Sequence, residues 1–520
     1  MFVFGGINHN RHFTVWYIII GWWLFGFVIF QWQCAYQFYQ QEQNQLFLFT
    51  GEYVGGFLDK PAWMACLSGE ALTILFHYPL MGAVITASIL SLHLGLTYLC
   101  LKAWLTRWGA ILASLLLTVL VAMCHFSFHY ALSSTLSIVG ALAVFIMSKP
   151  LLKKSWKVAI PVSLVVAMMT YWMFGYGVWL YVLLSILSKW RSGVLVLLLS
   201  LLIIPILKRT YVLPVQELYT YPGIGTLKFP NSAIETGFQV EHAYETGEWD
   251  EVVRIVEGLS FDKENLVQQR ILLFFYNLVQ AQRGNLPDVL LKYYPTELGT
   301  FITMLPETPL LLYRNMHELY YAIGDMTWAG NAAMKACASA THGRNARMIQ
   351  RLAECHLVIG DTAASRKYLR MLGKTGVYRN WARLVEQDTQ YKHKACLQNQ
   401  TDSVNSNTYV MMQQLMASNP HNEVALDYML CSELLLKDLE SFKKDYDHYC
   451  LKSPRQRKIY QEALCIVLTS INAPEEEWQR YKIDSQTFSR LSQYSERKNF
   501  GGFSDTYWYY YDELEPSVFH

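Results

Sequence analysis

Seven apolar runs fill the first 209 residues of this 520-residue chain, and they limit what that part can fold into. A helix needs about 20 mostly apolar residues to cross a bilayer, with its backbone polar groups bonded within the segment. The runs are Phe13–Gln33, Pro79–Leu101, Gly109–Met123, Ala131–Met147, Val158–Phe174, Gly177–Leu187 and Gly193–Leu207, of which the sixth is the weakest. The first is too long and too aromatic for a cleaved signal peptide. We therefore expect residues 1–209 to form a transmembrane helix bundle of about seven spans.

The Lys and Arg residues of this part are unevenly divided between the two sides of the expected bundle. Nine lie on the side of the amino terminus, namely Arg11, Lys102, Arg107, Lys149, Lys153, Lys154, Lys157, Lys189 and Arg191, and three lie on the other side, namely Lys60, Lys208 and Arg209. Short loops rich in Lys and Arg remain in the cytoplasm. Seven spans therefore predict a cytoplasmic amino terminus and, in a bacterium, a periplasmic carboxyl-terminal domain. If the sixth run does not cross, the number of spans is even and the carboxyl-terminal domain lies on the other side, but Lys189 and Arg191 would then face outward.

All four acidic residues of the membrane part lie between the first two runs, in an external loop at residues 34–78. They are Glu42, Glu52, Asp59 and Glu70, and no Asp or Glu occurs from Ala71 to Gln216. One interpretation is a solvated loop. The other is a catalytic loop, which would require one carboxylate to sit in a cavity with a shifted pKa. The stretch "PAWMACLSGEALTILF" after Lys60 predicts a short interfacial helix before the second span.

The carboxyl-terminal part has a different composition and an internal repeat. Residues 1–209 take 12 of the 43 basic and 4 of the 41 acidic residues, so the remainder carries a net charge of −6. A linker at 210–230 leads to residues 231–500, where a Gly and a polar residue recur at Gly247, Gly284, Gly324 and Gly360, and Lys437–Asp438 is a fifth such turn. Each turn separates two amphipathic helical patterns. Such helix pairs stack into a solenoid with a concave binding surface, and the alternative is an irregular helical domain.

Several residues outside the repeats are chemically notable. His125 and His129 lie four residues apart but have no third ligand nearby, and His77 and His93, in or near the second run, fit either a functional or a packing role. Six cysteines of the carboxyl-terminal part fit buried thiols or disulfides, namely Cys337, Cys355, Cys396, Cys431, Cys450 and Cys465. The tail at 501–520 contains "YWYYYDELE", which predicts either a cap docked on the last helices or a partner-binding peptide.

Three resemblances to known families are visible. The fourth repeat resembles a tetratricopeptide (TPR) unit, since Leu352, Ala353, Gly360, Asp361, Ser365 and Leu369 occupy its small and apolar positions. With "FLDKPAWMACLSGEALTILFHYPLMGAV" and "GFQVEHAYETGEWDEVVRIVEGL", the whole chain resembles an uncharacterised Bacteroidetes family of polytopic membrane proteins with a TPR-like carboxyl-terminal domain. More loosely, its architecture is similar to that of GT-C glycosyltransferases, which transfer sugar from a polyprenyl-phosphate lipid. That similarity implies that Glu52 or Asp59 acts as base or metal ligand, although the paired acidic motif usual in those enzymes is missing.

These observations leave two functional hypotheses. The first is an inner-membrane protein whose periplasmic solenoid binds a protein or peptide as a scaffold in envelope assembly. The second is a GT-C-like transferase, in which one of Glu42, Glu52, Asp59 and Glu70 is catalytic and the ligand is a lipid-linked sugar. A mildly acidic soluble domain is a poor nucleic-acid partner. No nucleotide-binding loop, Ser/His/Asp order or zinc signature is recognised, so neither a metal site nor a cofactor is predicted, and the sequence leaves open whether the chain is an enzyme.

Overall fold

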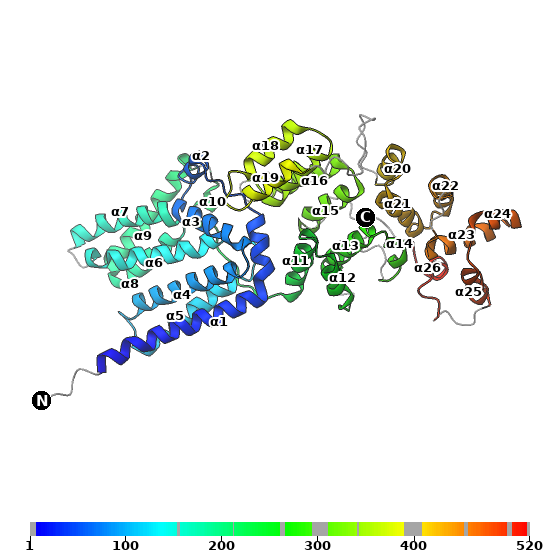
Figure 1. Cartoon of the computed structure of the whole chain (residues 1–520). Helices are drawn as coiled ribbons and strands as arrows, with labels where there is room; N and C mark the ends of the chain where they lie inside the picture. The colour runs from blue at the N-terminus through cyan, green and yellow to red at the C-terminus, as the bar shows by residue number, and fades with distance from the viewer. Residues whose placement is uncertain are drawn as a thin grey trace. The chain divides into compact units, whose positions relative to one another are not determined.

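The computed structural model describes residues 7–152, 156–211, 213–260, 266–293, 310–340, 343–388, 408–451, 456–496 and 502–516, and the regular structure in these ranges is helical throughout (Figure 1). The expected all-α fold is confirmed. The chain divides into two compact units. Unit 1 contains Met1–Glu235, Arg344–Ala346 and Arg370–Arg383, and unit 2 contains Thr236–Gly343, Arg347–Leu369 and Leu384–His520.

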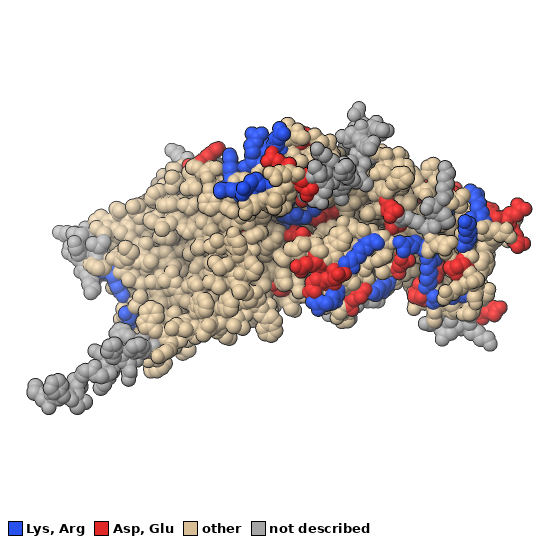
Figure 2. Space-filling model, in the orientation of Figure 1, with Lys and Arg blue, Asp and Glu red and all other residues tan. Residues whose placement is uncertain are grey.

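Unit 1 consists of the apolar helices and the connections between them. Its elements are α1 (Ile7–Gln43), α2 (Gly51–Gly55), α3 (Trp63–Thr73), the 3₁₀ helix η1 (Ile74–His77), α4 (Met81–Leu101), α5 (Arg107–Cys124), α6 (Leu132–Leu152), α7 (Trp156–Phe174), α8 (Gly177–Ser188), α9 (Trp190–Ile206), η2 (Leu207–Arg209), α10 (Val215–Thr220) and α19 (Arg379–Gln387, to Arg383). Figure 2 shows few charged side chains over α1 and α4–α9 on the face in view.

Each of the seven apolar runs lies in a helix of this unit to within two residues at either end of the run. Four segments are long and apolar enough to cross a membrane, namely Thr14–Gln43, Met81–Leu101, Arg107–Cys124 and Leu132–Pro150. Three further apolar helices are shorter, namely Ala159–Phe174, Gly177–Ser188 and Trp190–Ile206. By length and composition, the described chain therefore associates with a membrane through four candidate spans.

Small residues allow close helix packing inside unit 1. A Cβ atom at Gly69 of α3 would lie 2.7 Å from the backbone nitrogen of Ser133 in α6. A Cβ at Gly140 of α6 would lie 2.2 Å from the Phe174 ring of α7. Helices in membranes approach through such small residues, because packing replaces the hydrophobic effect there. The predicted helix before α4 is therefore present as α3, and it packs against α6 and α7.

Unit 2 consists of successive helix pairs. Its elements are α11 (Ser232–Glu245, from Thr236 on), α12 (Trp249–Glu257), α13 (Leu266–Gln282), α14 (Leu286–Val289), α15 (Leu310–Ile323), α16 (Met326–Ala338), α17 (Ala346–Val358, from Arg347 on), α18 (Thr362–Leu372, to Leu369), α20 (Thr408–Ser418), α21 (Glu423–Leu435), α22 (Leu439–Tyr449), α23 (Lys458–Ser470), α24 (Glu475–Tyr481), α25 (Ser485–Ser495) and α26 (Tyr507–Glu513). The end of α19 also belongs to this unit.

The predicted turns between these helices have the required backbone conformation. Gly247, Gly284, Gly324 and Gly360 have positive φ angles of 79°, 72°, 94° and 81°, and Lys437 has a φ of 58°. Glycine reaches this region without the steric penalty that a Cβ imposes, so it ends the first helix of a pair. Asp325, Asp361 and Asp438 then accept a hydrogen bond from the backbone N–H three residues on, which caps the second helix.

The aromatic tail packs into unit 2. Tyr507 and Trp508 of α26 are buried, and each donates a hydrogen bond to a backbone carbonyl: Tyr507 Oη to Leu434 O at 2.8 Å and Trp508 Nε1 to Glu462 O at 2.9 Å. The tail thus docks on α21 and α23. The nine cysteines of the described chain are buried thiols, and Cys396 lies outside the described residues.

Candidate functional site

The end of α1 carries an unusual number of buried polar side chains. They belong to the stretch "QFYQQEQNQ" at residues 37–45, and the buried members are Gln37, Gln40, Glu42, Gln43 and Gln45. Buried amides require hydrogen-bond partners, and several are backbone carbonyls of neighbouring segments. Gln37 Nε2 donates to His125 O at 2.8 Å, and Gln45 Nε2 donates to Glu70 O at 3.0 Å. This polar cluster joins the end of α1 to the ends of α5 and α3.

Glu42 lies at the centre of the most concentrated chemistry in unit 1. Its side chain is 4% exposed, and Tyr378 Oη donates a hydrogen bond to Glu42 Oε2 at 2.6 Å. His77 Nδ1 lies 3.7 Å from the same oxygen. The His77 ring is 31% exposed and contacts the Tyr378 ring edge-on at 5.5 Å between centroids. Carboxylates and imidazoles are side chains that act in general acid–base catalysis, which requires a bound group within hydrogen-bond reach of one of them.

The other three acidic residues of the predicted loop lie in different surroundings. Glu70 in α3 is half-buried and accepts a hydrogen bond from Tyr53 Oη at 2.6 Å. Glu52 in α2 and Asp59 are exposed. The structure therefore provides a buried, partnered carboxylate at Glu42 and a partly buried one at Glu70, whereas Glu52 and Asp59 fit the solvated interpretation better.

Glu235 holds a bend in α1 from outside the helix. Its carboxylate accepts hydrogen bonds from the backbone N–H groups of Tyr36 at 2.7 Å and of Gln37 at 3.2 Å. Figure 1 shows that α1 changes direction before its end, and a side chain that bonds the helix backbone is one of the known causes of such a change. Burial raises the pKa of Glu235 to about 7, although the two backbone hydrogen bonds oppose this shift.

Two histidines of the membrane part, His93 and His125, are buried and hydrogen-bonded. His93 in α4 is buried with Nδ1 2.9 Å from Thr118 Oγ1 of α5. His125 is buried with Nε2 2.8 Å from Thr135 Oγ1, and burial lowers its pKa to about 3. His129 is exposed, and no helix joins it to His125. No group of three His, Cys, Asp or Glu side chains able to hold a metal ion occurs among the residues that the structure describes.

Unit 2 contains a buried charge network that composition alone does not reveal. Glu318 of α15 accepts hydrogen bonds from Arg347 at 2.7 Å and from Arg351, both of α17, and Arg351 also donates to Glu354 at 2.7 Å. Nearby attraction from Arg351 and Arg347 holds the pKa of Glu318 far below its usual range, even though burial acts in the opposite direction. The charges are therefore mutually compensated.

The same network continues to α11. Arg314 of α15 donates to both carboxylate oxygens of Glu241 at 2.9 and 3.0 Å, and Arg347 Nε lies 3.4 Å from Glu245. His317 is fully buried and accepts a hydrogen bond from Arg351 Nε on Nδ1 at 3.2 Å, so it is neutral. Removing one partner of a buried ion pair is strongly destabilising, because the other charge then stays buried without compensation.

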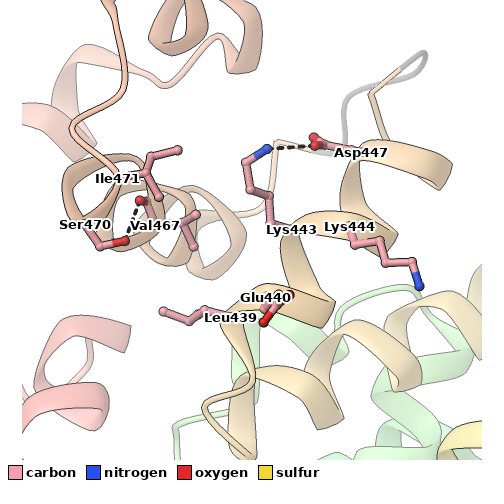
Figure 3. A pocket seen from close by; sticks show the side chains of 8 residues that line it. All are labelled: Leu439, Glu440, Lys443, Lys444, Asp447, Val467, Ser470 and Ile471. Atoms are coloured by element: carbon pink, nitrogen blue, oxygen red, sulfur yellow. Dashed lines mark hydrogen bonds and ion pairs between the residues drawn. The ribbon is translucent and has the colours of Figure 1, made fainter.

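A pocket of about 360 Å³ lies in unit 2 between α22 and α23 (Figure 3). Its apolar lining residues are Leu439, Val467 and Ile471. The polar ones are Glu440, Lys443, Lys444, Asp447 and Ser470. Lys443 is held by Asp447 at 3.0 Å and Glu477 at 3.5 Å. Its size is at the lower end of the range for small-ligand pockets, so it suits a single side chain of a partner.

Sequence reasoning missed Tyr378, the glutamine-rich end of α1 and the arginines of α17. Tyr378 is 336 residues from Glu42, so no local pattern connects the two. The run "QFYQQEQNQ" was a visible signal, because its six amides directly after an apolar stretch have to find buried partners if the helix continues into the protein.

A family model described as a family of unknown function, DUF6057, matches residues 9–513 of the chain. No curated protein and no solved structure matches it.

Proposed function

We propose a function for this chain, which belongs to the family of unknown function DUF6057. It is an inner-membrane protein that presents a periplasmic TPR-like α-solenoid, and the solenoid is a scaffold that binds a protein or peptide in envelope assembly. The observation that carries this proposal is the series of helix pairs in unit 2. Their positive-φ turns recur after 37, 40, 36 and 77 residues, the last being about twice the mean spacing. Helix pairs repeated at this spacing expose binding surfaces along a stack.

The proposed topology uses all seven apolar helices. The helices α7, α8 and α9 are shorter than the four candidate spans, but α8 and α9 pack against one another and α7 packs on both. Short helices cross where the bilayer thins or where neighbouring helices cover their ends. In this arrangement, nine Lys and Arg residues lie in the cytoplasm, and the carboxyl-terminal unit follows α9 on the periplasmic side.

The pocket between α22 and α23 supports peptide binding by unit 2. Its lining combines three apolar residues with Lys and Asp residues, which suits an apolar side chain flanked by polar groups. We expect the substitution Ile471→Arg, which fills the pocket with a charge, to reduce binding of the partner. Ile471 is 52% exposed, so the substitution should not unfold the unit.

Complementation of a deletion strain tests the scaffold. The full chain and the Ile471→Arg variant are compared at equal membrane levels with a chain ending at residue 230, which lacks unit 2 and also residues 231–235, 344–346 and 370–383 of unit 1. The scaffold requires loss of function for the truncated chain and impaired function for Ile471→Arg. Full function of the truncated chain would show that unit 2 is dispensable and would contradict the proposal.

The second candidate function is a GT-C-like transferase that takes its sugar from a polyprenyl-phosphate donor. Glu42 favours it, since this carboxylate is buried at the end of a candidate span beside a partly exposed His77. Such a residue is placed to accept a proton from an acceptor hydroxyl group.

The transferase test compares Glu42→Gln with the exposed controls Glu52→Gln and Asp59→Asn. Only Glu42→Gln should abolish complementation at normal protein levels. Tyr378→Phe separates catalysis from packing, because it removes the hydrogen bond to Glu42 but keeps the carboxylate. Full complementation by Glu42→Gln would exclude the transferase.

A further inference from the structure

Unit 1 carries a group of exposed basic residues that neither proposed function uses. Residues 370–383 contain Arg370, Lys374, Arg379 and Arg383, all exposed, and contain no Asp or Glu. We call this stretch the basic segment. Figure 2 shows blue side chains gathered over α18 and α19, the helices on which three of these four residues lie.

The basic segment has no acidic partner among the residues that the structure describes. No ion pair joins any of the four residues to an Asp or Glu in the described part of the chain. Their hydrogen bonds are local and neutral: Arg379 Nε donates to Gly373 O at 3.1 Å, and Arg383 Nη2 donates to Asn380 Oδ1 at 2.6 Å. Exposed cations without counter-charges attract anions from outside the molecule.

The basic segment is attached to the end of a candidate span. Tyr378 donates a hydrogen bond to Glu42, the second-last residue of the segment Thr14–Gln43, and Phe49 N donates to Lys374 O at 3.2 Å. The polar headgroup layer extends roughly 5–7 Å beyond the hydrocarbon core on each side. A segment fixed to the end of a span therefore lies close to the depth of lipid phosphates.

Apolar side chains beside the basic segment point to the same partner. Phe49 is 62% exposed, and a Cβ at Gly376 would lie 3.3 Å from its ring. Leu58 is 49% and Val54 is 37% exposed on the connection that follows α1. Surfaces that combine Lys and Arg with exposed Phe and Leu bind the membrane interface, because the rings enter the acyl boundary while the cations meet phosphates.

We propose that the basic segment binds the phosphate headgroups of anionic bilayer lipids and so holds this part of unit 1 against the membrane surface. The role is independent of whether unit 2 binds a peptide or Glu42 is catalytic. Each basic residue near an anionic surface contributes roughly fivefold to binding, so two of them contribute about 25-fold.

Native mass spectrometry of the full chain in a neutral maltoside detergent tests the proposal. The probes are dioctanoyl phosphatidylglycerol and dioctanoyl phosphatidylcholine. The variant Arg379→Gln/Arg383→Gln is compared with Lys335→Gln/Lys482→Gln, which removes two exposed charges from unit 2. We expect the wild type and the control to bind phosphatidylglycerol more tightly than phosphatidylcholine. The basic-segment variant should lose about 25-fold in affinity for phosphatidylglycerol only.

Three results would overturn the proposal. The first is equal binding of the two lipids by the wild type. The second is unchanged affinity for phosphatidylglycerol in both Arg379→Gln/Arg383→Gln and Arg370→Gln/Lys374→Gln. A loss of affinity in the control Lys335→Gln/Lys482→Gln equal to that of the basic-segment variant would count in the same way. The third is displacement of phosphatidylglycerol by inorganic phosphate at matched ionic strength, which would assign the surface to a soluble phosphate.

Discussion

The buried charge network of unit 2 makes a strong prediction for the substitution Glu318→Gln. Glu318 is the shared partner of Arg347 and Arg351, whose side chains are 14% and 4% exposed. Glutamine keeps the shape and one acceptor oxygen but removes the negative charge. Two guanidinium groups would then remain buried with only Glu245 and Glu354 to compensate them.

The expected magnitude follows from the burial of these groups. Breaking a buried ion pair by removing one partner costs about 3–5 kcal/mol. With about 2–3 °C per kcal/mol for a unit of this size, the Tm should fall by roughly 6–15 °C. The matched control is Glu257→Gln, because Glu257 and Lys292 form an ion pair with both side chains 42% exposed. Exposed pairs contribute about 0–1 kcal/mol, so the control should stay within about 3 °C of the wild type.

Thermal unfolding of the full chain in detergent, followed by tryptophan fluorescence between pH 4 and pH 8, measures both effects. The pKa of Glu318 is lowered in the folded state, so its contribution is present above the unfolded pKa near 4.3 and is lost as the pH falls below it. The gap between the wild type and Glu318→Gln should therefore be constant from pH 8 to about pH 5 and narrow below that. A Tm within 2 °C of the wild type at pH 7 would refute the reasoning, as would an equal loss in the control.

Three further predictions concern glycine positions and a buried acid. Gly360→Ala should lower the free energy of unfolding by about 1–2 kcal/mol, because a φ of 81° is unfavourable for alanine. Gly237→Ala inside α11, where a Cβ also meets open space, should leave the free energy of unfolding unchanged or raise it by up to about 1 kcal/mol, and urea unfolding compares the two variants. Because the pKa of Glu235 is raised to about 7, its contribution to the stability of the folded state is fully present below pH 4.3 and is lost as the pH rises through 7. If the difference in Tm between the wild type and Glu235→Gln is the same at pH 4.5 and pH 8, this prediction is wrong. Gly69→Ala should reduce folded protein in membranes, since its Cβ would lie 2.7 Å from the backbone of Ser133, whereas Gly21→Ala meets no atom within 4 Å; equal yields would disprove the close α3–α6 packing.

Local patterns predicted the helices and their turns well. The apolar runs, the helix before α4 and the glycines at the turns each have a signal within about 20 residues, and each appears where it was expected. A periodic apolar pattern needs no distant partner to define it. The docking of the tail could also be predicted, because consecutive aromatic side chains have large apolar surfaces that burial stabilises.

The arrangement of the candidate site was beyond such patterns. Glu42 was one of four acidic candidates, and nothing local distinguished it from the exposed Glu52. Its burial depends on Tyr378, which reaches it from another part of the chain. The charges of α15 and α17 were similarly hidden, because Glu, Arg and His residues on a helix usually face solvent. Partners separated by tens or hundreds of residues are specified by tertiary packing.

The side of the membrane on which unit 2 lies is the central claim of the proposed function, and reporter fusions test it most directly. Alkaline phosphatase folds only after export, and green fluorescent protein exported through the same route does not fluoresce. Each is fused after residue 516, and each is fused after residue 104 as a cytoplasmic reference. The proposal predicts an active phosphatase and a dark fluorescent protein at residue 516, with the reverse at residue 104. Fluorescence without phosphatase activity at residue 516 would place unit 2 in the cytoplasm and contradict the account.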